Sequence, residues 1–273
     1  LGVRYTKEDR DYTPDQYFEE LPLGPNPNVV CYSSTGVPAT CQIGDRVVPY
    51  ETVNNTMSET TPLLNLAYAI NNDTMIYATY SEGFKVGGFN QRIFPPEPSL
   101  PKFNPEYVET YEVGIKAEML DRDLRLNAAI FSSDYTDLQL LIAEPSRVGP
   151  YITNAGEATI EGIELEISYI TPNMIFIDLA SGYTDAGYDE LNASALAFGL
   201  TVDTPFGFIS EWNTHLSITK SFDLSGGGSF SPRLDWTWRS GFYTNASGLP
   251  LPPPWSDDAL YQPDYSVINV SAR

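Results

Sequence analysis

Histidine, cysteine and basic side chains are scarce in this sequence, and their scarcity excludes several classes of protein. One histidine, His215, and two cysteines among 273 residues are too few ligands for a zinc site. Only 15 lysines and arginines stand against 36 aspartates and glutamates, so the net charge is −21. A chain of this charge repels a phosphate backbone. We therefore expect no nucleic-acid partner, no metal centre and no cofactor.

Long apolar runs are also missing. The longest apolar cluster, LQLLIA at 138–143, is interrupted by Gln139 and is far shorter than the roughly 18 residues of a transmembrane helix. No signal peptide is predicted, because charges fill the N-terminal segment GVRYTKEDRDY where an apolar core is needed. The pairs Asp189–Glu190 and Asp257–Asp258 lack the spacing of a calcium loop. Most acids are therefore expected on a solvated surface.

Two glycine-rich stretches raise the question of a nucleotide site: YATYSEGFKVGGFN at 77–90 and SGGGS at 225–229. A phosphate-binding loop needs a lysine and then Ser or Thr after its last glycine, whereas here Gly88 is followed by Phe89. A dinucleotide-binding loop must open a helix, which the prolines from Pro95 onward exclude. Both stretches are predicted to be turns, with a ligand contact at the first as the less favoured alternative.

The two cysteines, Cys31 and Cys41, enclose the segment CYSSTGVPATC, in which Ser, Thr, Gly and Pro predominate. Such a pair in a polar loop favours a disulfide formed in an oxidising compartment. Two free thiols are the alternative.

Apolar and polar residues alternate with period two along several segments, whereas no long segment shows the period of a helix. In GIELEISY, Ile163 and Leu165 share one face, while Glu164 and Glu166 share the other. The alternating runs are about 9 to 13 residues long, close to the roughly 9 to 11 that a tilted strand needs to cross a bilayer. The same alternation occurs in LLNLAYAI (63–70), DLRLNAAI (123–130), MIFIDLASGY (174–183) and FSPRLDWTW (230–238).

Short and long connections take turns along the chain. The short ones lie at 71–73, 120–123, 171–173 and 223–228, and the long ones at 13–56, 84–106, 138–150, 186–208 and 240–263. Bacterial barrels combine tight periplasmic turns with long outer loops. We therefore predict an all-β fold: a transmembrane antiparallel β-barrel contributing about ten strands, with short periplasmic turns and long extracellular loops.

The two faces of each strand have different chemistry in this prediction. Full charges such as Arg125, Glu164 and Asp235 suit a water-filled or plugged lumen, whereas the apolar face suits lipid. Aromatic residues near strand ends, such as Trp236 and Trp238, suit the membrane interface.

The glycine-rich stretch at 77–90 is then interpreted as the point where a strand leaves the membrane. The strand is predicted from about Thr74 to Ser81, and Glu82–Asn90 forms the exit, where glycine permits the chain to turn.

Three blocks, in order and over about 100 residues, resemble the C-terminal barrel region of TonB-dependent outer-membrane receptors. They are YATYSEGFKVGGFN, FNPEYVETYEVGIKAEMLDRDLRLNAAIFSSDYTDLQ and YITNAGEATIEGIELEISY. The residues that carry the resemblance are Gly83, Phe84, Lys85, Gly87, Gly88, Phe89 and Asn90 at the strand exit, and Glu106, Tyr111, Glu112, Gly114, Lys116, Asn154, Gly156, Gly162 and Glu164 in the strands that follow.

The resemblance implies a large barrel, of the 22-stranded type, whose lumen holds an N-terminal plug domain. Such receptors lie in the outer membrane of Gram-negative bacteria, in contact with lipid and lipopolysaccharide. They import scarce nutrients, commonly ferric siderophores and in other branches cobalamin or glycans, with energy from the TonB inner-membrane complex. The sequence shows no plug, no TonB box and no final aromatic-ended strand, so residues 1–273 are expected to be part of the barrel domain.

Two other functions stay open at this point. A secreted or periplasmic all-β carbohydrate-active enzyme could use a carboxylate pair such as Glu164 and Glu166, although one such pair arises easily among so many acids. A passive outer-membrane porin is the other alternative. We expect no catalytic residue, and the sequence indicates no substrate-binding residue.

Overall fold

The computed structural model describes residues 1–19, 30–33, 37–38, 40–91, 93, 95–142, 151–244 and 260–273. Its main element is one antiparallel sheet of ten strands, which confirms the predicted all-β fold and strand number. No described helix is long and apolar enough to cross a membrane. The ten strands, in their order across the sheet, are β1 (Gly2–Tyr12), β2 (Val53–Ala69), β3 (Thr74–Lys85), β6 (Glu106–Met119), β7 (Leu124–Thr136), β10 (Gly156–Ile170), β11 (Ile175–Leu191), β12 (Trp212–Lys220), β15 (Pro232–Arg239) and β18 (Tyr265–Ala272).

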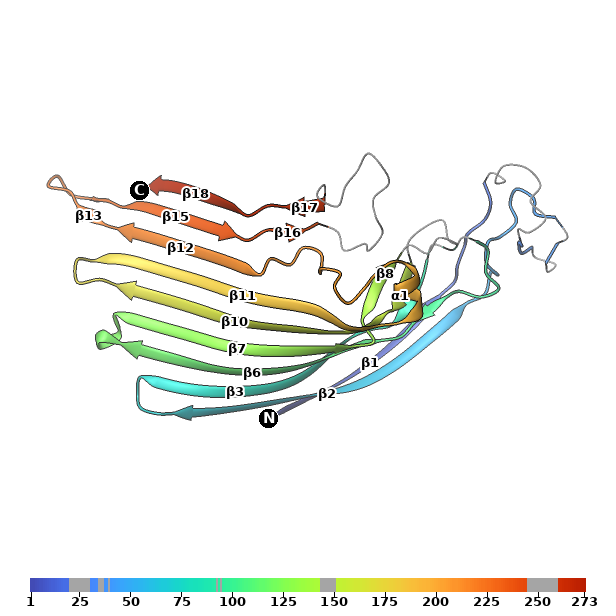
Figure 1. Ribbon diagram of the computed structural model, residues 1–273, viewed down its shortest axis with the longest axis horizontal. Helices are drawn as coiled ribbons and strands as arrows, with labels where there is room; N and C mark the ends of the chain where they lie inside the picture. Colours follow the sequence, from blue (N-terminus) through green and yellow to red (C-terminus); the bar gives the residue numbers. More distant parts are fainter. Residues whose placement is uncertain are drawn as a thin grey trace.

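The order of the strands across the sheet is their order along the chain, so the chain runs up and down through a curved wall (Figure 1). All tight turns lie at one end of this wall, and all long connections lie at the other (Figure 1). One turn contains the 3-10 helix η1 (Leu120–Arg122), and another contains the small hairpin of β13 (Phe222–Asp223) and β14 (Ser229–Phe230). The predicted alternation of short and long connections is thereby confirmed.

The strand register places most of the apolar residues of the ten strands on one face. Ile163 of β10, for example, lies opposite Ile130 of β7 and Tyr183 of β11. This apolar face is exposed in the chain by itself, with 53% of Ile163 and 64% of Ile268 accessible. Its residues include Leu64, Leu66, Tyr68, Ile76, Ala78, Val113, Ile115, Ala128, Ile130, Ile163, Leu165, Ile167, Ile177, Leu179, Leu216, Ile218, Leu234, Trp236, Ile268 and Val270.

The predicted end of the third strand is wrong. β3 does not stop near Ser81 but continues to Lys85, because Glu82–Lys85 pair with the first residues of β6. The chain therefore leaves the sheet at Val86, and the exit is shorter than predicted. β2 and β11, at 17 residues each, are also longer than the predicted range. These strands extend beyond the segments in which apolar and polar residues alternate, because backbone hydrogen bonds do not require an apolar side chain.

Several of the long connections contain structure that the sequence did not predict. The connection after β7 forms a hairpin of β8 (Gln139–Ile142) and β9 (Tyr151–Asn154), and the connection after β11 forms the short helix α1 (Ala193–Ala197). Both pack onto the inner side of the wall through one buried cluster, here called the inner cluster. Its buried residues are Leu138, Ile142, Ala155, Ala158, Tyr188, Leu191, Ala195, Phe198 and Leu200.

A second buried group, the outer cluster, joins the connection 13–52 to the connection 86–105, which contains β4 (Gly88–Phe89) and β5 (Lys102–Phe103). It comprises Phe18, Cys31, Val47, Val48, Ile93 and Leu100. The fifth long connection carries a small hairpin of β16 (Phe242–Tyr243) and β17 (Tyr261–Gln262). The described loops therefore pack against each other and against the wall.

Candidate functional site

The face of the sheet opposite the apolar face is lined by charged and amide side chains, and we call it the polar face. The inner cluster packs on the same side, because Ala158 alternates in phase with Glu164 along β10. The polar face is therefore the side over which the loops fold. Its residues include Glu112, Lys116, Glu118, Arg125, Asn127, Glu164, Glu166, Ser168, Asp178, Asn213, His215, Ser217, Arg233, Asp235 and Asn269.

We call the residues that carry the family resemblance the signature residues. Two glycines among them make room for aromatic rings on the polar face. A Cβ on Gly114 would lie 2.5 Å from the ring of Tyr77 on the neighbouring strand, and a Cβ on Gly162 would lie 2.5 Å from the ring of Phe131. The hydroxyl of Tyr77 lies across Gly114, 2.5 Å from the Cβ position there, and Glu112 is two residues away on the same face. The glycines thus position rings beside the signature acids.

Ion pairs on the polar face join some of its charges and leave others without a basic partner. Arg233 donates three hydrogen bonds to Asp235, at 2.8, 2.9 and 3.0 Å, and Arg125 donates one to Glu118 at 3.2 Å. Glu166 accepts a hydrogen bond from Asn127. Within the described residues, no ion pair involves Glu112 or Glu164.

Beside Glu164 the polar face is hollowed. A depression of about 320 Å³ lies between Glu164 and Glu166 on one side and Asn213 and His215 on the other. Its floor is formed by β11, where the polar-face positions are occupied by Ala180 and Gly182, which are too small to fill the space. The described part of the chain contains no group of three histidine, cysteine or carboxylate residues that could hold a metal ion. Asp257 and Asp258 lie outside the described residues.

Aromatic pairs and then carboxylates mark the loop end of the apolar face. Tyr80 and Tyr111 pack with ring centroids 5.0 Å apart, as do Tyr183 and Trp212. One or two residues further toward the loops, Glu109 lies directly opposite both Glu82 and Asp134. A row of aromatic residues followed by charged residues is typical of the edge of a bilayer. The Trp residues predicted for this role, Trp236 and Trp238, lie on the apolar face as expected.

The remaining signature residues lie at the base of the loops, where they bind backbone groups. Asn90 is 7% exposed and bonds to both the N–H and the C=O of Ile152, at 2.7 and 2.8 Å. The Glu106 carboxylate accepts the backbone N–H of Gln139 at 2.7 Å, with Lys85 Nζ 3.9 Å away. These side chains bind loop backbone groups. This role is structural, in line with the expectation of a turn in preference to a ligand contact.

Asn154 and Gly156 lie at the junction between the hairpin β8–β9 and the wall. Gly156 has φ +155°, and a Cβ there would lie 1.8 Å from the Glu190 carbonyl oxygen, so only glycine fits. Asn154 donates from its amide to the backbone oxygens of Asn104, Asp137 and Pro105, at 3.0, 2.7 and 3.4 Å.

The other exit residues pack inside the connection 86–105. Gly87 and Gly88 are buried against Phe103, and Phe89 packs on the outer cluster with Lys102 Nζ 5.2 Å from its ring centroid. Gly83 and Phe84 belong to β3 and lie opposite residues of β6.

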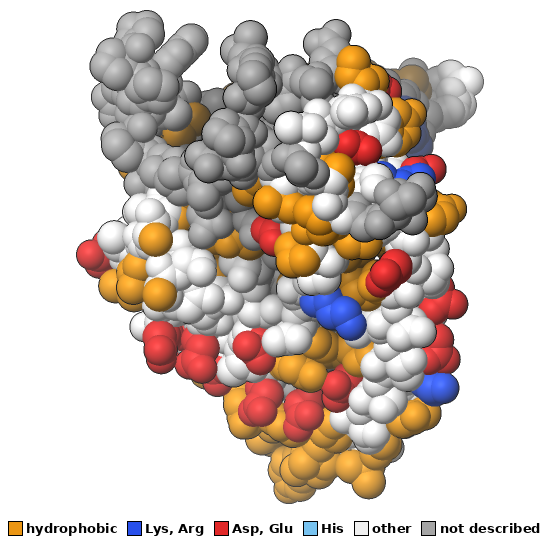
Figure 2. All heavy atoms as spheres, turned by 90° about the vertical axis from the view of Figure 1, so that its right-hand side faces the viewer, with side chains coloured by type: hydrophobic (Ala, Val, Ile, Leu, Met, Phe, Trp, Pro, Cys, Tyr) orange, Lys and Arg blue, Asp and Glu red, His pale blue; other side chains and the backbone are white. Residues whose placement is uncertain are grey.

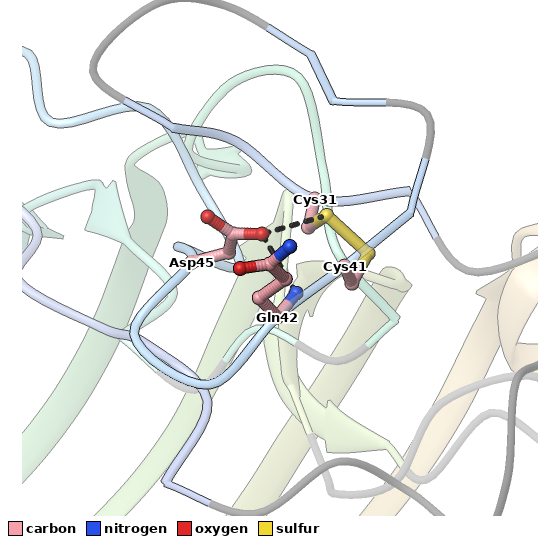
Figure 3. The surroundings of a disulfide bond; sticks show 4 residues. All are labelled: Cys31, Cys41, Gln42 and Asp45. Atoms are coloured by element: carbon pink, nitrogen blue, oxygen red, sulfur yellow. Dashed lines mark hydrogen bonds between the residues drawn. A yellow bond between two sulfur atoms is a disulfide. The ribbon is translucent and has the colours of Figure 1, made fainter.

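Cys31 and Cys41 form a disulfide, as predicted (Figure 3). Cys31 is fully buried in the outer cluster, and Asp45 Oδ2 lies 3.6 Å from its sulfur. The same carboxylate oxygen accepts the backbone N–H of Gln42 at 2.8 Å (Figure 3). The bridge thus ties the connection 13–52 to its own core.

The loop end of the molecule is acidic. Figure 2 looks onto this end and shows many acidic side chains (red) against few basic ones (blue). The acids spread over the surface, as the sequence predicts.

Sequence reasoning missed two side-chain amides that complete the loop contacts. Gln139 is 9% exposed, and Asn192 caps α1 while donating to the Asn154 carbonyl oxygen at 2.5 Å. The available signal was Gln139 itself, the one polar residue inside the apolar run LQLLIA. A polar residue inside an apolar run is a candidate for a buried hydrogen-bonding role.

Comparison with known proteins agrees with this architecture. The family model described as "TonB dependent receptor-like, beta-barrel" matches residues 1–273. The chain is 27% identical over 239 residues, 86% of its length, to the ferric-pyoverdine 358 receptor of Pseudomonas putida. It is 29% identical over 131 residues, 48% of its length, to the metal-pseudopaline receptor CntO of Pseudomonas aeruginosa. These matches span 26% and 17% of the two receptors, so the chain corresponds to about a quarter of such a protein.

Solved structures share the fold. The ferric yersiniabactin uptake receptor FyuA from Yersinia pestis superposes with a TM-score of 0.63 at 20% identity, covering 81% of this chain and 30% of the receptor. The ferric-catecholate import receptor Fiu from E. coli gives a TM-score of 0.63 at 14% identity, covering 98% of this chain and 34% of the receptor. The match to the family model covers every strand of the wall, and this chain therefore belongs to the TonB-dependent receptor β-barrel family of the Gram-negative outer membrane.

Proposed function

We propose that the complete protein is an energy-coupled outer-membrane receptor that imports a ferric siderophore or a similar scarce metal chelate. The observation that carries the proposal is the family match over residues 1–273. The wall supports it, because an apolar outer face and a charged inner face suit a membrane barrel with an aqueous or protein-filled lumen. The names of the relatives, which are ferric-siderophore and metal receptors, support a metal chelate as cargo.

The polar face would meet the plug domain of the complete protein. Glu112 and Glu164 have no basic partner within the described residues, and the depression beside Glu164 leaves space for an incoming side chain. Glu112 is half-buried and Glu164 is exposed here, and once the plug covers such a carboxylate it is stable only when it is paired or hydrogen-bonded. We infer that basic side chains of the plug pair with these two acids. The TonB inner-membrane complex would then act on the plug.

The structure favours a receptor over the two alternatives. The inner cluster and the hairpin β8–β9 fold over the polar face, whereas a passive porin needs an open path. An enzyme of this kind would need Glu164 and Glu166 to act as a pair, but Glu166 already accepts a hydrogen bond from Asn127. The sequence relative that covers most of the chain is a receptor. We infer that this region contributes no catalytic residue.

Uptake under altered membrane energy tests the proposal. A strain lacking the gene is complemented with the full-length protein and supplied with the iron-55 complexes of pyoverdine and yersiniabactin, and with others if neither supports growth under iron starvation. We expect accumulation of label in energised cells and only surface-bound label after addition of an uncoupler. Accumulation that continues after the uncoupler would contradict the importer and favour a pore.

The loops and the coupling segment should have separable effects. Deleting most of the connection 13–52 or 240–264 is expected to reduce binding of the iron-55 chelate at the cell surface. Deleting the TonB-contacting segment of the complete protein is expected to abolish accumulation and leave surface binding unchanged. Equal loss of both activities in both deletions would contradict this division of roles.

A further inference from the structure

Gln139, the first residue of the hairpin β8–β9, bonds to a loop far away in the sequence. Its side-chain amide donates to the backbone oxygens of Asn104, at 2.9 Å, and Val86, at 3.0 Å, which are 35 and 53 residues away. Both acceptors belong to the connection 86–105. Gln139 is 9% exposed, so water has little access to replace these partners.

Two further amides join the same two segments. Asn154, the register partner of Gln139, accepts the Asn104 backbone N–H at 2.7 Å. On the other side of the hairpin, Asn90 of the connection 86–105 bonds to both backbone groups of Ile152 and so replaces a neighbouring strand. Three side-chain amides therefore bind the connection 86–105 to the hairpin.

These bonds are separate from the packing that holds the hairpin to the wall. Leu138 and Ile142 belong to the inner cluster, whereas the shortest bonds of the Gln139 amide go to the connection 86–105. Its contact with the wall is a longer bond, 3.5 Å, to the carbonyl oxygen of Lys85 at the end of β3. Because the amides of Gln139 and Asn90 are buried, breaking one of their bonds alone leaves a polar group unsatisfied, so these bonds are expected to break together. The connection 86–105 is in turn joined to the connection 13–52 by the Glu97 N–H and the Val47 C=O, 2.9 Å apart.

We propose that Gln139 is a positioning residue that locks the connection 86–105 to the hairpin β8–β9, so that these two outer loops move as one body when cargo is captured. The role in cargo capture rests on the proposed function. The locking itself is a property of the two loops and is measured without cargo.

Hydrogen exchange of the full-length receptor in detergent tests the lock. Gln139→Met keeps the length of the side chain and removes its donors, so it should leave the hairpin packed on the wall. We expect amide exchange to rise at least tenfold in both 86–105 and 151–155, with 193–200 unchanged. The control Asn65→Leu removes a wall hydrogen bond to Thr79 and should change neither loop.

A distance measurement gives a second readout. Spin labels at Ser99→Cys and Leu141→Cys, both exposed positions, report the separation of the two loops. We expect one narrow distance distribution in the parent and a broad one in Gln139→Met. Should Gln139→Met fail to assemble, Asn90→Leu removes a second contact between the same loops and is measured identically. Faster exchange in the hairpin alone, or an unchanged distance distribution, would overturn the proposal.

Discussion

At the scale of single residues, the signature positions of this chain have packing and hydrogen-bonding roles. Glycines at 114 and 162 accept aromatic rings from neighbouring strands, and Gly156 adopts a backbone conformation closed to other residues. Asn90 and Asn154 bond to backbone groups of other loops. Each residue type follows from a local demand for space or for a two-sided hydrogen-bonding group.

Adding one methyl group at Gly114 should harm assembly. In Gly114→Ala the new Cβ lies 2.5 Å from the Tyr77 ring, so the ring must move, and overpacking of this kind costs roughly 1–3 kcal/mol. The matched control is Gly187→Ala, because no atom lies within 4 Å of a Cβ there. The midpoint of urea unfolding of the full-length protein in lipid vesicles should fall for Gly114→Ala only. Equal midpoints for the two variants would show that Tyr77 does not depend on Gly114.

The Cys31–Cys41 bridge should be present in the protein isolated from cells. Closing a loop of this size stabilises the folded state by about 2–3 kcal/mol in the chain-entropy model. Intact-mass measurement after alkylation, with and without prior reduction, checks the bridge. We expect alkylation at both cysteines only after reduction, and labelling without reductant would contradict the bridge.

At the scale of elements, the ten strands share one division into two faces. Leu165 and Glu164 are neighbours in β10 but lie on opposite faces, and their cross-strand partners, Ala128 and Ala129, continue that division. Within the described strands, the charges of the apolar face lie at its two ends, beyond the aromatic pairs at the loop end and at Lys220 at the turn end. Only lipid covers such a face at low cost along its whole length.

A charge on the apolar face should therefore block assembly. Leu165→Arg places a cation toward lipid, at a cost of about 2–4 kcal/mol near the membrane midplane. Glu164→Arg, one residue away, places the same group on the polar face, where assembly should tolerate it. Heat-modifiability on a gel distinguishes assembled from unassembled full-length barrel. Equal loss in the two variants would reject the assignment of the faces.

At the scale of the whole molecule, the ten strands form a curved sheet whose two ends differ in the length of their connections. Tight turns lie at one end, and loops with two buried clusters lie at the other (Figure 1). The inner cluster packs on the polar side of the wall, and the outer cluster joins two of the loops beside it.

The complete protein should behave as an integral outer-membrane protein. An apolar face across all ten strands needs lipid or detergent to cover it. After separation of the membranes on a density gradient, we expect the protein in the outer-membrane fraction and in solution only after addition of detergent. Recovery in the periplasmic fraction without detergent would contradict the membrane barrel and favour a secreted all-β protein.

The sequence alone determined the strands, their two faces and the separation of short turns from long loops. Those features follow from a period of two and from local turn chemistry, which neighbouring residues specify. The disulfide was also predictable, because only two cysteines are present. The sequence alone misplaced the outer end of β3, since cross-strand pairing with β6 extends it to Lys85.

Only the tertiary structure decided how the loops are joined. Asn90 meets Ile152 across 62 residues, and Gln139 meets Asn104 across 35, so nothing near either residue in the sequence identifies its partner. A carboxamide can bond to any exposed backbone group, and its choice depends on which loops the wall brings together. The strand order sets that proximity by placing the connections after β3 and after β7 at the same end of neighbouring strand pairs.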